Sequence, residues 1–287
     1  MGNQSLTNPC VNLVIFTCSG REHLLLGTFE SFKKKVDFGF SQTILAIDGE
    51  INPAVVQVIK PDIIIQHFKR NGYVNSISKT LALIDAPYFF WLEDDWSFQE
   101  EVPLNLLLKE ISRNTNWTQI ILSKFGPLNN EQREKKLFGD LYETDFGFSA
   151  NPSLCNTKHL RSAFGMLKIA VKGDVLGHDG FENFLTRTFN QAGLACVILD
   201  PKNNYPIKHE GYLETTARNW HMINSLETRT SEHLLTIPKP SIPRRLIMLV
   251  KLFMVFLSLS FRQLFNNKIY EFCFRVITSA DSAKKDE

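Results

Sequence analysis

The sequence predicts an α/β protein built on a doubly wound, mainly parallel mixed sheet that is flanked by helices. Two observations predict this fold class. In the first half of the chain, apolar segments of strand length alternate with segments whose apolar residues recur at helical spacing. In addition, residues 88–92 (YFFWL) form an unbroken apolar run, which is typical of a strand that a parallel sheet buries on both faces.

The first half supplies strands and helices in turn. The expected elements are a strand at 11–17, a helix at 21–35, strands at 42–47 and 63–66, and a helix at 73–85 that leads into the apolar strand. The second half is less regular. It is expected to hold a helix at 104–112, a strand at 117–123, a polar surface excursion at 124–141, a strand at 146–149, a helix at 181–192 and a strand at 195–199.

Composition limits the class of protein. The 287 residues are 44% hydrophobic, which is ample for a large core, and a net charge of +2 argues against a general nucleic-acid binder. The five cysteines are scattered and show no Cys-x-x-Cys spacing, which favours a reduced compartment. No basic and apolar leader is apparent at the first residues. We therefore expect a cytoplasmic protein.

The last fifty residues differ from the rest. We expect a globular domain at 1–237 and a basic, apolar helical tail at 238–287, separated by a proline-punctuated linker. The apolar stretch 246–261 is too short and too charged for a confident membrane span, for which about 20 apolar residues are needed. Two interpretations stay open. Residues 244–277 make peripheral contact with an anionic inner membrane face, or the tail packs on the globular domain or on a second subunit.

Three carboxylates, Glu93, Asp94 and Asp95, follow directly after the apolar strand. The carboxyl ends of strands are where open α/β sheets bind ligands. Adjacent carboxylates repel one another and are costly to bury, which favours a compensating cation. Oxygen ligands suit Mg²⁺ or Mn²⁺, with a phosphate completing the coordination. The alternative is a solvated loop in which Asp95 caps a short turn.

The order of these pieces resembles the GT-A glycosyltransferases, closest in style to family 2. The resemblance is carried by a first strand that ends in Thr17-x-x-x-Arg21, a second strand that ends in Asp48, and the acidic triplet, and it covers roughly residues 11–212. It implies a GT-A-type fold and a metal-dependent, inverting transferase. Such an enzyme moves a sugar from a nucleotide-diphosphate donor, a UDP- or GDP-sugar, to a hydroxyl of a glycan or lipid-linked glycan.

The resemblance also implies a metal and nucleotide site. Asp95 is then the direct metal ligand, and Glu93 and Asp94 contact the metal, its waters or the ribose; Glu93 stands where the family usually has Asp. His209 completes the metal site or meets the diphosphate, and an imidazole ligand favours Mn²⁺ over Mg²⁺. Thr17 and Asp48 border the nucleotide.

Three cations are candidates to contact the base or diphosphate: Arg21, Arg70 and Lys79. For any one of them taken alone, an ordinary surface charge is the favoured interpretation. The base that deprotonates the acceptor is expected near the start of the helix at 181–192, with Glu182 as first choice and Asp179 as second. Asn183 stands where the family commonly has Asp, and helix capping is the alternative role for both carboxylates.

Other functions compete with this one. A phosphohydrolase with an Asp-x-Asp strand end needs an Asp nucleophile where this chain has Glu93. A nucleotidyltransferase needs a glycine-rich phosphate loop with a basic residue after the first strand, and Ser19-Gly20-Arg21 is a poor substitute. A non-catalytic protein that binds a nucleotide or a partner on a degenerate GT-A fold stays open.

Overall fold

The computed structural model describes residues 10–69, 72–123, 128, 130–144, 147–172, 181–201, 205–210, 250 and 253. The chain divides into two units, Met1–Leu234 and Leu235–Glu287. All elements below belong to the first unit. Of the second unit the described residues are Val250 and Phe253, which are helical and exposed.

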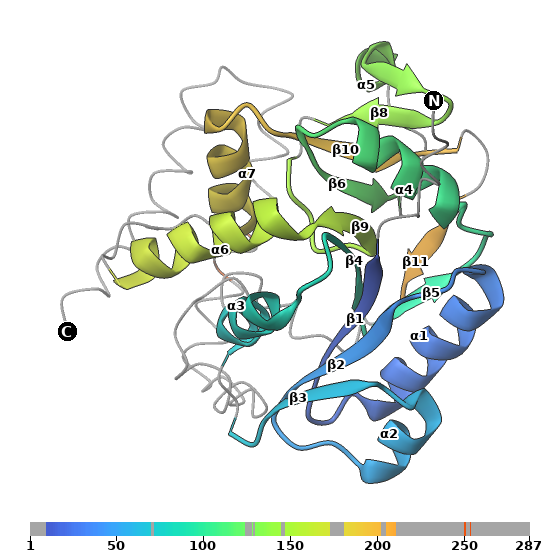
Figure 1. Cartoon of the computed structure of the whole chain (residues 1–287), viewed down its shortest axis with the longest axis vertical. Coiled ribbons are helices and arrows are strands. Elements are labelled where there is room, and N and C mark those ends of the chain that lie inside the picture. The colour runs from blue at the N-terminus through green and yellow to red at the C-terminus, as the bar shows by residue number, and fades with distance from the viewer. Residues whose placement is uncertain are drawn as a thin grey trace, which may run out of the picture. The chain divides into compact units, whose positions relative to one another are not determined.

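A nine-stranded mixed sheet forms the core of the first unit (Figure 1). Its strand order is β3 (Ile63–His67), β2 (Gln42–Asp48), β1 (Val11–Cys18), β4 (Tyr88–Glu93), β9 (Ser153–Asn156), β6 (Trp117–Leu122), β10 (Ala195–Leu199), β8 (Leu141–Glu143) and β7 (Lys136–Phe138). The first four strands are mutually parallel, and β10 is parallel to β6. β9 is antiparallel to both β4 and β6, so β6 and β10 run in the same direction as β4. The predicted doubly wound, mainly parallel mixed sheet is confirmed.

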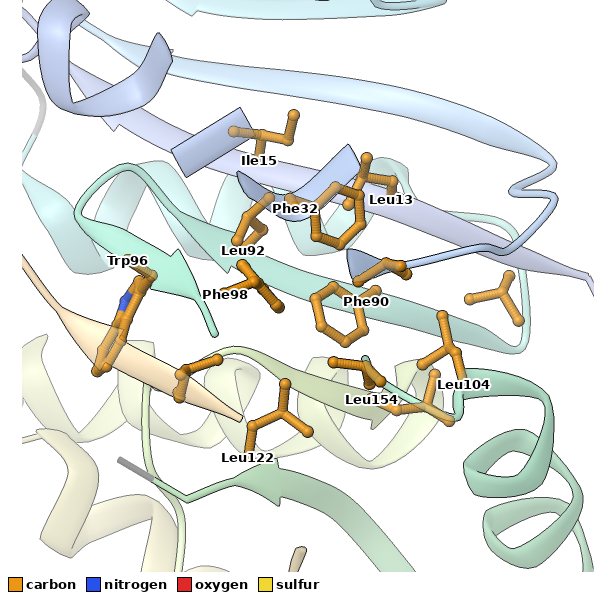
Figure 2. Packing of buried hydrophobic residues seen from close by; sticks show 14 of the residues in the cluster. Leu13, Ile15, Phe32, Phe90, Leu92, Trp96, Phe98, Leu104, Leu122 and Leu154 are labelled. Atoms are coloured by element: carbon orange, nitrogen blue, oxygen red, sulfur yellow. The ribbon is translucent and has the colours of Figure 1, made fainter. Parts of the chain in front are cut away.

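The central strands are buried on both faces, as their apolar runs predict. Along β1 and β4, alternate side chains enter two separate apolar clusters. Figure 2 shows one of them, where Phe32 of α1 (Glu22–Lys35) lies between Leu13 and Ile15 of β1 on one side and Phe90 and Leu92 of β4 on the other. The rings of Phe32 and Phe90 have centroids 5.5 Å apart. Continuous apolar sequence is therefore required here, because neither face of the sheet meets water.

Helices cover each face of the sheet (Figure 1). The cluster that contains Phe90 includes side chains of α1, α2 (Pro53–Ile59) and α4 (Leu104–Arg113). The cluster on the other face includes side chains of α3 (Tyr73–Leu83), α6 (Thr157–Lys172) and α7 (Phe181–Gln191). The remaining helix, α5 (Asn130–Glu134), precedes the edge strands β7 and β8.

One expectation for the second half is wrong, and another is incomplete. Residues 147–149 form no strand; the strand of this region is β9, which begins at Ser153. Gly147 has a φ of 69°, and the Phe148 amide donates to the Thr186 side chain of α7 over 3.0 Å, so it does not take part in a strand ladder. The described part of the surface excursion expected at 124–141 is indeed exposed or half-buried up to residue 140, but it also contains α5 and the exposed edge strand β7, which pairs with β8.

The parallel strands bring their carboxyl ends to one edge of the sheet. Phe16 pairs with Glu93 and Cys18 with Asp48, so the ends of β1, β2 and β4 lie side by side. Directly after β4 the chain enters β5 (Trp96–Phe98), which pairs antiparallel with β11 (Ile207–His209). This small second sheet sets His209 opposite Trp96, immediately beyond the acidic triplet.

Candidate functional site

Asp94 and Asp95 form the centre of the candidate site, in the turn between β4 and β5. Each is only 4% exposed. The turn is anchored to α1 because the Trp96 amide donates to Thr28 Oγ1 over 3.0 Å. Burial raises the pKa of Asp94 to about 6, although the charge of Arg21 opposes the shift. Two adjacent carboxylates in this position require compensating donors or cations.

Two residues predicted as nucleotide contacts supply part of that compensation. Thr17, at the end of β1, donates from Oγ1 to Asp94 Oδ2 over 2.6 Å. Arg21, at the start of α1, spans both aspartates: its Nε lies 2.9 Å from Asp94 Oδ1 and its Nη2 lies 2.5 Å from Asp95 Oδ2. Burial opposes the charge on Arg21, but the two carboxylates raise its pKa above the ordinary value.

His209 joins the aspartates from β11. Its Nε2 lies 3.1 Å from Asp95 Oδ2, and its ring lies against Trp96 with centroids 4.6 Å apart. Burial raises the pKa of Asp95, but the hydrogen bond with His209 and the charge of Arg21 outweigh it and hold the pKa below the usual range. Of the three carboxyl groups, Asp95 is thus the one whose pKa is lowered.

Glu93 is engaged differently from the two aspartates. Its Oε1 accepts from the Tyr73 hydroxyl of α3 and, over 3.2 Å, from Trp91 Nε1. Burial raises the pKa of Glu93 to about 8, with the charge of Asp95 adding to the shift and the Tyr73 hydrogen bond opposing it. A carboxyl group with this pKa is mostly protonated at pH 7. Sequence reasoning did not find Tyr73, because nothing near residue 73 indicates a partner twenty positions away.

Asp48 lies at the end of β2 and is 7% exposed. Its Oδ2 accepts from the Gly72 amide over 3.1 Å, at the N-terminus of α3, where Gly72 has a φ of 85°. A carboxylate at a helix N-terminus is stabilised by the helix dipole. Asp48 thus holds α3, and with it Tyr73, against the edge of the sheet.

Glu182 enters the site region from the first turn of α7. Its Oε1 accepts from the Ala150 amide over 2.9 Å. The neighbouring Phe181 ring contacts the Tyr73 ring with centroids 5.5 Å apart, and the charge of Glu182 raises the pKa of Tyr73 together with burial and Glu93. Tyr73 therefore connects the acidic triplet with the predicted base.

The loop that presents Ala150 is held by a buried glutamine that sequence reasoning missed. Gln119, on β6, donates from Nε2 to Ser149 O over 2.6 Å and accepts at Oε1 from Ser149 N over 3.2 Å. It is fully buried, as is Ser153, whose hydroxyl accepts from the same Nε2. The sequence signal for this role is an amide side chain within a strand that is otherwise apolar except for Thr118.

The other predicted site residues are not brought to the aspartates by any described contact. Lys79 is exposed on α3, where it lines a cavity with His67 and Arg161. Six residues along a helix place it about 9 Å further along the axis than Tyr73. Arg70, Asp179 and the tail at 244–277, apart from positions 250 and 253, lie outside the described residues. The membrane contact expected of that tail stays a prediction.

The donor set fits a divalent metal in part. No group of three His, Cys, Asp or Glu side chains is arranged as a metal site within the described residues. However, Asp95 Oδ1 is buried and has no hydrogen-bond partner, and a buried carboxylate oxygen without a partner is costly. Together with His209 it offers one oxygen and one nitrogen ligand, a pair suited to Mn²⁺, while a diphosphate would supply further oxygens.

The sheet order, the helices on both faces and the polar groups at the carboxyl ends of β1 and β4 define a GT-A-like α/β fold. Among solved structures, the chain is similar to the crystal structure of GalNAc-T7 with UDP, GalNAc and Mn²⁺, with a TM-score of 0.50 and 12% sequence identity. The match covers 71% of this chain and 44% of that one, so this chain spans less than half the length of GalNAc-T7. At this identity the similarity shows the fold and not an activity.

No protein-family model matches the chain, and no curated protein matches it. The assignment to family 2 therefore stays a prediction. In the described parts of the chain, no helix has the length and hydropathy that are needed to cross a bilayer.

Proposed function

We propose that this protein is a metal-dependent glycosyltransferase that moves a sugar from a nucleotide-diphosphate donor to a hydroxyl of a glycan or lipid-linked glycan. The observation that carries the proposal is the position of Asp95: it is buried just after the carboxyl end of β4, with one oxygen 3.1 Å from His209 Nε2 and the other without a hydrogen-bond partner among the described residues. The GT-A-like fold supports the general class, a transferase that uses a nucleotide sugar, and not the particular donor or acceptor.

In this proposal Asp95 and His209 hold Mn²⁺ or Mg²⁺, and the ion would neutralise charge that develops on the departing nucleoside diphosphate. Thr17 and Asp48 border the nucleotide at the ends of β1 and β2. Asp94 is held by Thr17 and Arg21 and contributes negative charge beside Asp95. Glu93, which Tyr73 and Trp91 bind at one oxygen, belongs to the outer part of the site.

Glu182 is the proposed base. The Ala150 amide holds Oε1 of Glu182, so the carboxylate is oriented before the acceptor arrives. It would take the proton of the acceptor hydroxyl while the sugar leaves the diphosphate on the opposite face, which gives inversion at the anomeric carbon. Asp179 stays the second choice.

The test is a set of melting temperatures with UDP, GDP, CDP and ADP, each with and without Mn²⁺. The proteins are wild type, Asp95→Asn and, as a control, Asp37→Asn at an exposed position. A ligand at one hundred times its dissociation constant stabilises by about 2.7 kcal/mol, which corresponds to a rise of roughly 5–10 °C for a domain of this size. We expect that rise with one diphosphate, only with Mn²⁺, in wild type and Asp37→Asn but not in Asp95→Asn.

Hydrolysis of the corresponding nucleotide sugar, followed by NMR, then tests the transfer chemistry. A released sugar of inverted configuration supports the inverting mechanism. Joint binding without any hydrolysis or transfer supports instead the non-catalytic alternative, a nucleotide-binding protein on the same fold. No rise with any pair of ligands contradicts both.

A further inference from the structure

Arg21 already occupies the place of a cation between Asp94 and Asp95. Within the described residues, Asp94 Oδ1 pairs with Arg21 Nε and Asp94 Oδ2 accepts from Thr17. Asp95 Oδ2 pairs with Arg21 Nη2 and His209, and Asp95 Oδ1 alone has no partner. A metal ion that used both Asp95 oxygens, or Asp95 with His209, would therefore compete with the guanidinium.

We propose that Arg21 is an exchangeable counter-ion, which neutralises the aspartates while the site is empty and leaves Asp95 when a divalent cation and a diphosphate bind. This inference rests on the proposed function. A guanidinium and a divalent cation on the same buried carboxylate repel each other strongly, because the site is shielded from water. The diphosphate offers the displaced guanidinium a new partner, since its planar donors pair with phosphate oxygens.

The attachment of Arg21 allows this exchange. Its side chain is 25% exposed, and as the N-cap residue of α1 it makes no side-chain capping bond. Its backbone is held independently, because Leu25 N donates to Arg21 O over 3.0 Å and the Leu25 side chain is fully buried. The guanidinium can therefore turn away while α1 stays in place.

Arg133 shows the opposite arrangement. Its guanidinium donates to Asp200, to Tyr142 and to Leu128 O, and it is 17% exposed. Three different partners hold it in one position, as expected of a structural ion pair. Within the described residues, the guanidinium of Arg21 forms ion pairs with the two aspartates alone, and both are groups that a metal would use.

The exchange makes the metal and the diphosphate bind with positive coupling. Metal alone must move Arg21 off Asp95 without giving it a new partner, so it binds weakly. Diphosphate alone gains Arg21 but leaves the aspartates without their cation. When both ligands bind, the diphosphate gives the displaced Arg21 a new partner and the metal neutralises the aspartates, so each ligand raises the affinity for the other. Coupling of this kind typically changes affinity by about 5- to 150-fold.

The experiment measures Mn²⁺ binding from the EPR signal of free Mn²⁺, with and without the diphosphate that stabilises wild type. It uses the full chain as wild type, Arg21→Gln and Arg113→Gln; Arg113 is an exposed arginine whose nearest carboxylate, Glu110, is 3.7 Å away. Wild type and Arg113→Gln should bind Mn²⁺ weakly alone and much more tightly with diphosphate. Arg21→Gln should bind Mn²⁺ alone about tenfold more tightly than wild type, with a smaller effect of diphosphate.

Unchanged or weaker binding of Mn²⁺ alone by Arg21→Gln, with coupling intact in wild type, overturns the counter-ion role and leaves the proposed function standing. Absence of Mn²⁺ binding by wild type with every diphosphate overturns the proposed function and this inference together. If Arg21→Gln does not fold, Arg21→Lys replaces it, because a single ammonium cannot span both aspartates. The Arg21→Lys protein should also bind Mn²⁺ alone more tightly than wild type does. Equal affinities of the two proteins overturn the inference.

Discussion

His209 Nε2 lies 3.1 Å from Asp95 Oδ2, although 114 positions separate the two residues in the chain. The contact depends on the pairing of β5 with β11, which sets His209 opposite Trp96. The Glu210 amide, which donates to Asp95 O over 2.8 Å, ties the end of β11 to the same turn. A short second sheet thus brings an imidazole to a buried carboxylate that a different strand supplies.

Replacing His209 by alanine should weaken Mn²⁺ binding in the presence of diphosphate by about 10- to 100-fold, the range found when groups that support a metal site are removed. The measurement is isothermal titration with Mn²⁺. His23→Ala, at an exposed position of α1, is the matched control and should bind as wild type does. A His209→Ala protein with the wild-type dissociation constant would contradict a role of the imidazole as a metal ligand.

Glu182→Gln should lower kcat for transfer by about 10²- to 10⁴-fold, because general-base catalysis contributes in this range. The amide oxygen of glutamine can still accept from the Ala150 amide, so the fold and diphosphate binding should be unchanged. Asn190→Ala, an exposed position further along α7, is the control. Equal kcat values for Glu182→Gln and wild type would move the role of base to Asp179.

Arg133→Gln should destabilise the fold by about 3–5 kcal/mol, because it leaves the carboxylate of Asp200 buried without its cation. Asp200 is fully buried, and Arg133 Nη2 lies 2.8 Å from its Oδ2. Urea unfolding measures the loss. Arg113→Gln, which removes an exposed pair, should stay within about 0.5 kcal/mol of wild type. Adding Asp200→Asn to Arg133→Gln should restore part of the stability; no restoration would assign the loss to packing against Tyr142.

Gly147→Ala should destabilise the protein by roughly 1–3 kcal/mol. Its φ is 69°, and an added Cβ would overlap the Thr186 side chain. Gly165→Ala is the matched comparison: this glycine lies inside α6 with open space around it, so alanine should stabilise by about 0.5–1 kcal/mol. Thermal unfolding measures both effects, and the melting temperature should fall for Gly147→Ala and rise for Gly165→Ala. Equal effects would mean that the loop before β9 adapts without cost.

Cys155 and Cys196 should resist alkylation in the folded protein. Burial raises the pKa of Cys155 to about 12, and burial with the nearby Cys155 raises that of Cys196 as well. At pH 8 the thiolate that reacts is therefore scarce at these positions, whereas Cys10 is exposed. Mass spectrometry after brief iodoacetamide treatment should find Cys10 modified and the other two modified only in urea. Equal labelling without urea would contradict the burial of β9 and β10.

Much of the fold was predictable because buried strands and helix faces require apolar residues at regular spacing, and this spacing is visible in the sequence. The run at 88–92 is apolar at every position since its strand has a helix layer on both faces, and the strand and helix segments of the first half were placed within a few residues. The second half was less predictable. Residues 147–149 have a strand-like composition, but the amides of Phe148 and Ser149 donate to the side chains of Thr186 and Gln119 and not to a neighbouring strand.

By itself, the sequence determined that the central strands are buried on both faces and that Asp94 and Asp95 follow the carboxyl end of β4. Both features follow from local patterns of apolar and charged residues. Only the tertiary structure decided which groups surround the aspartates. Thr17 meets Asp94 because β1 is the neighbour of β4, and His209 meets Asp95 because β11 pairs with β5. Strand order and the pairing of distant segments are set by the packing of the whole domain, and no local pattern encodes them.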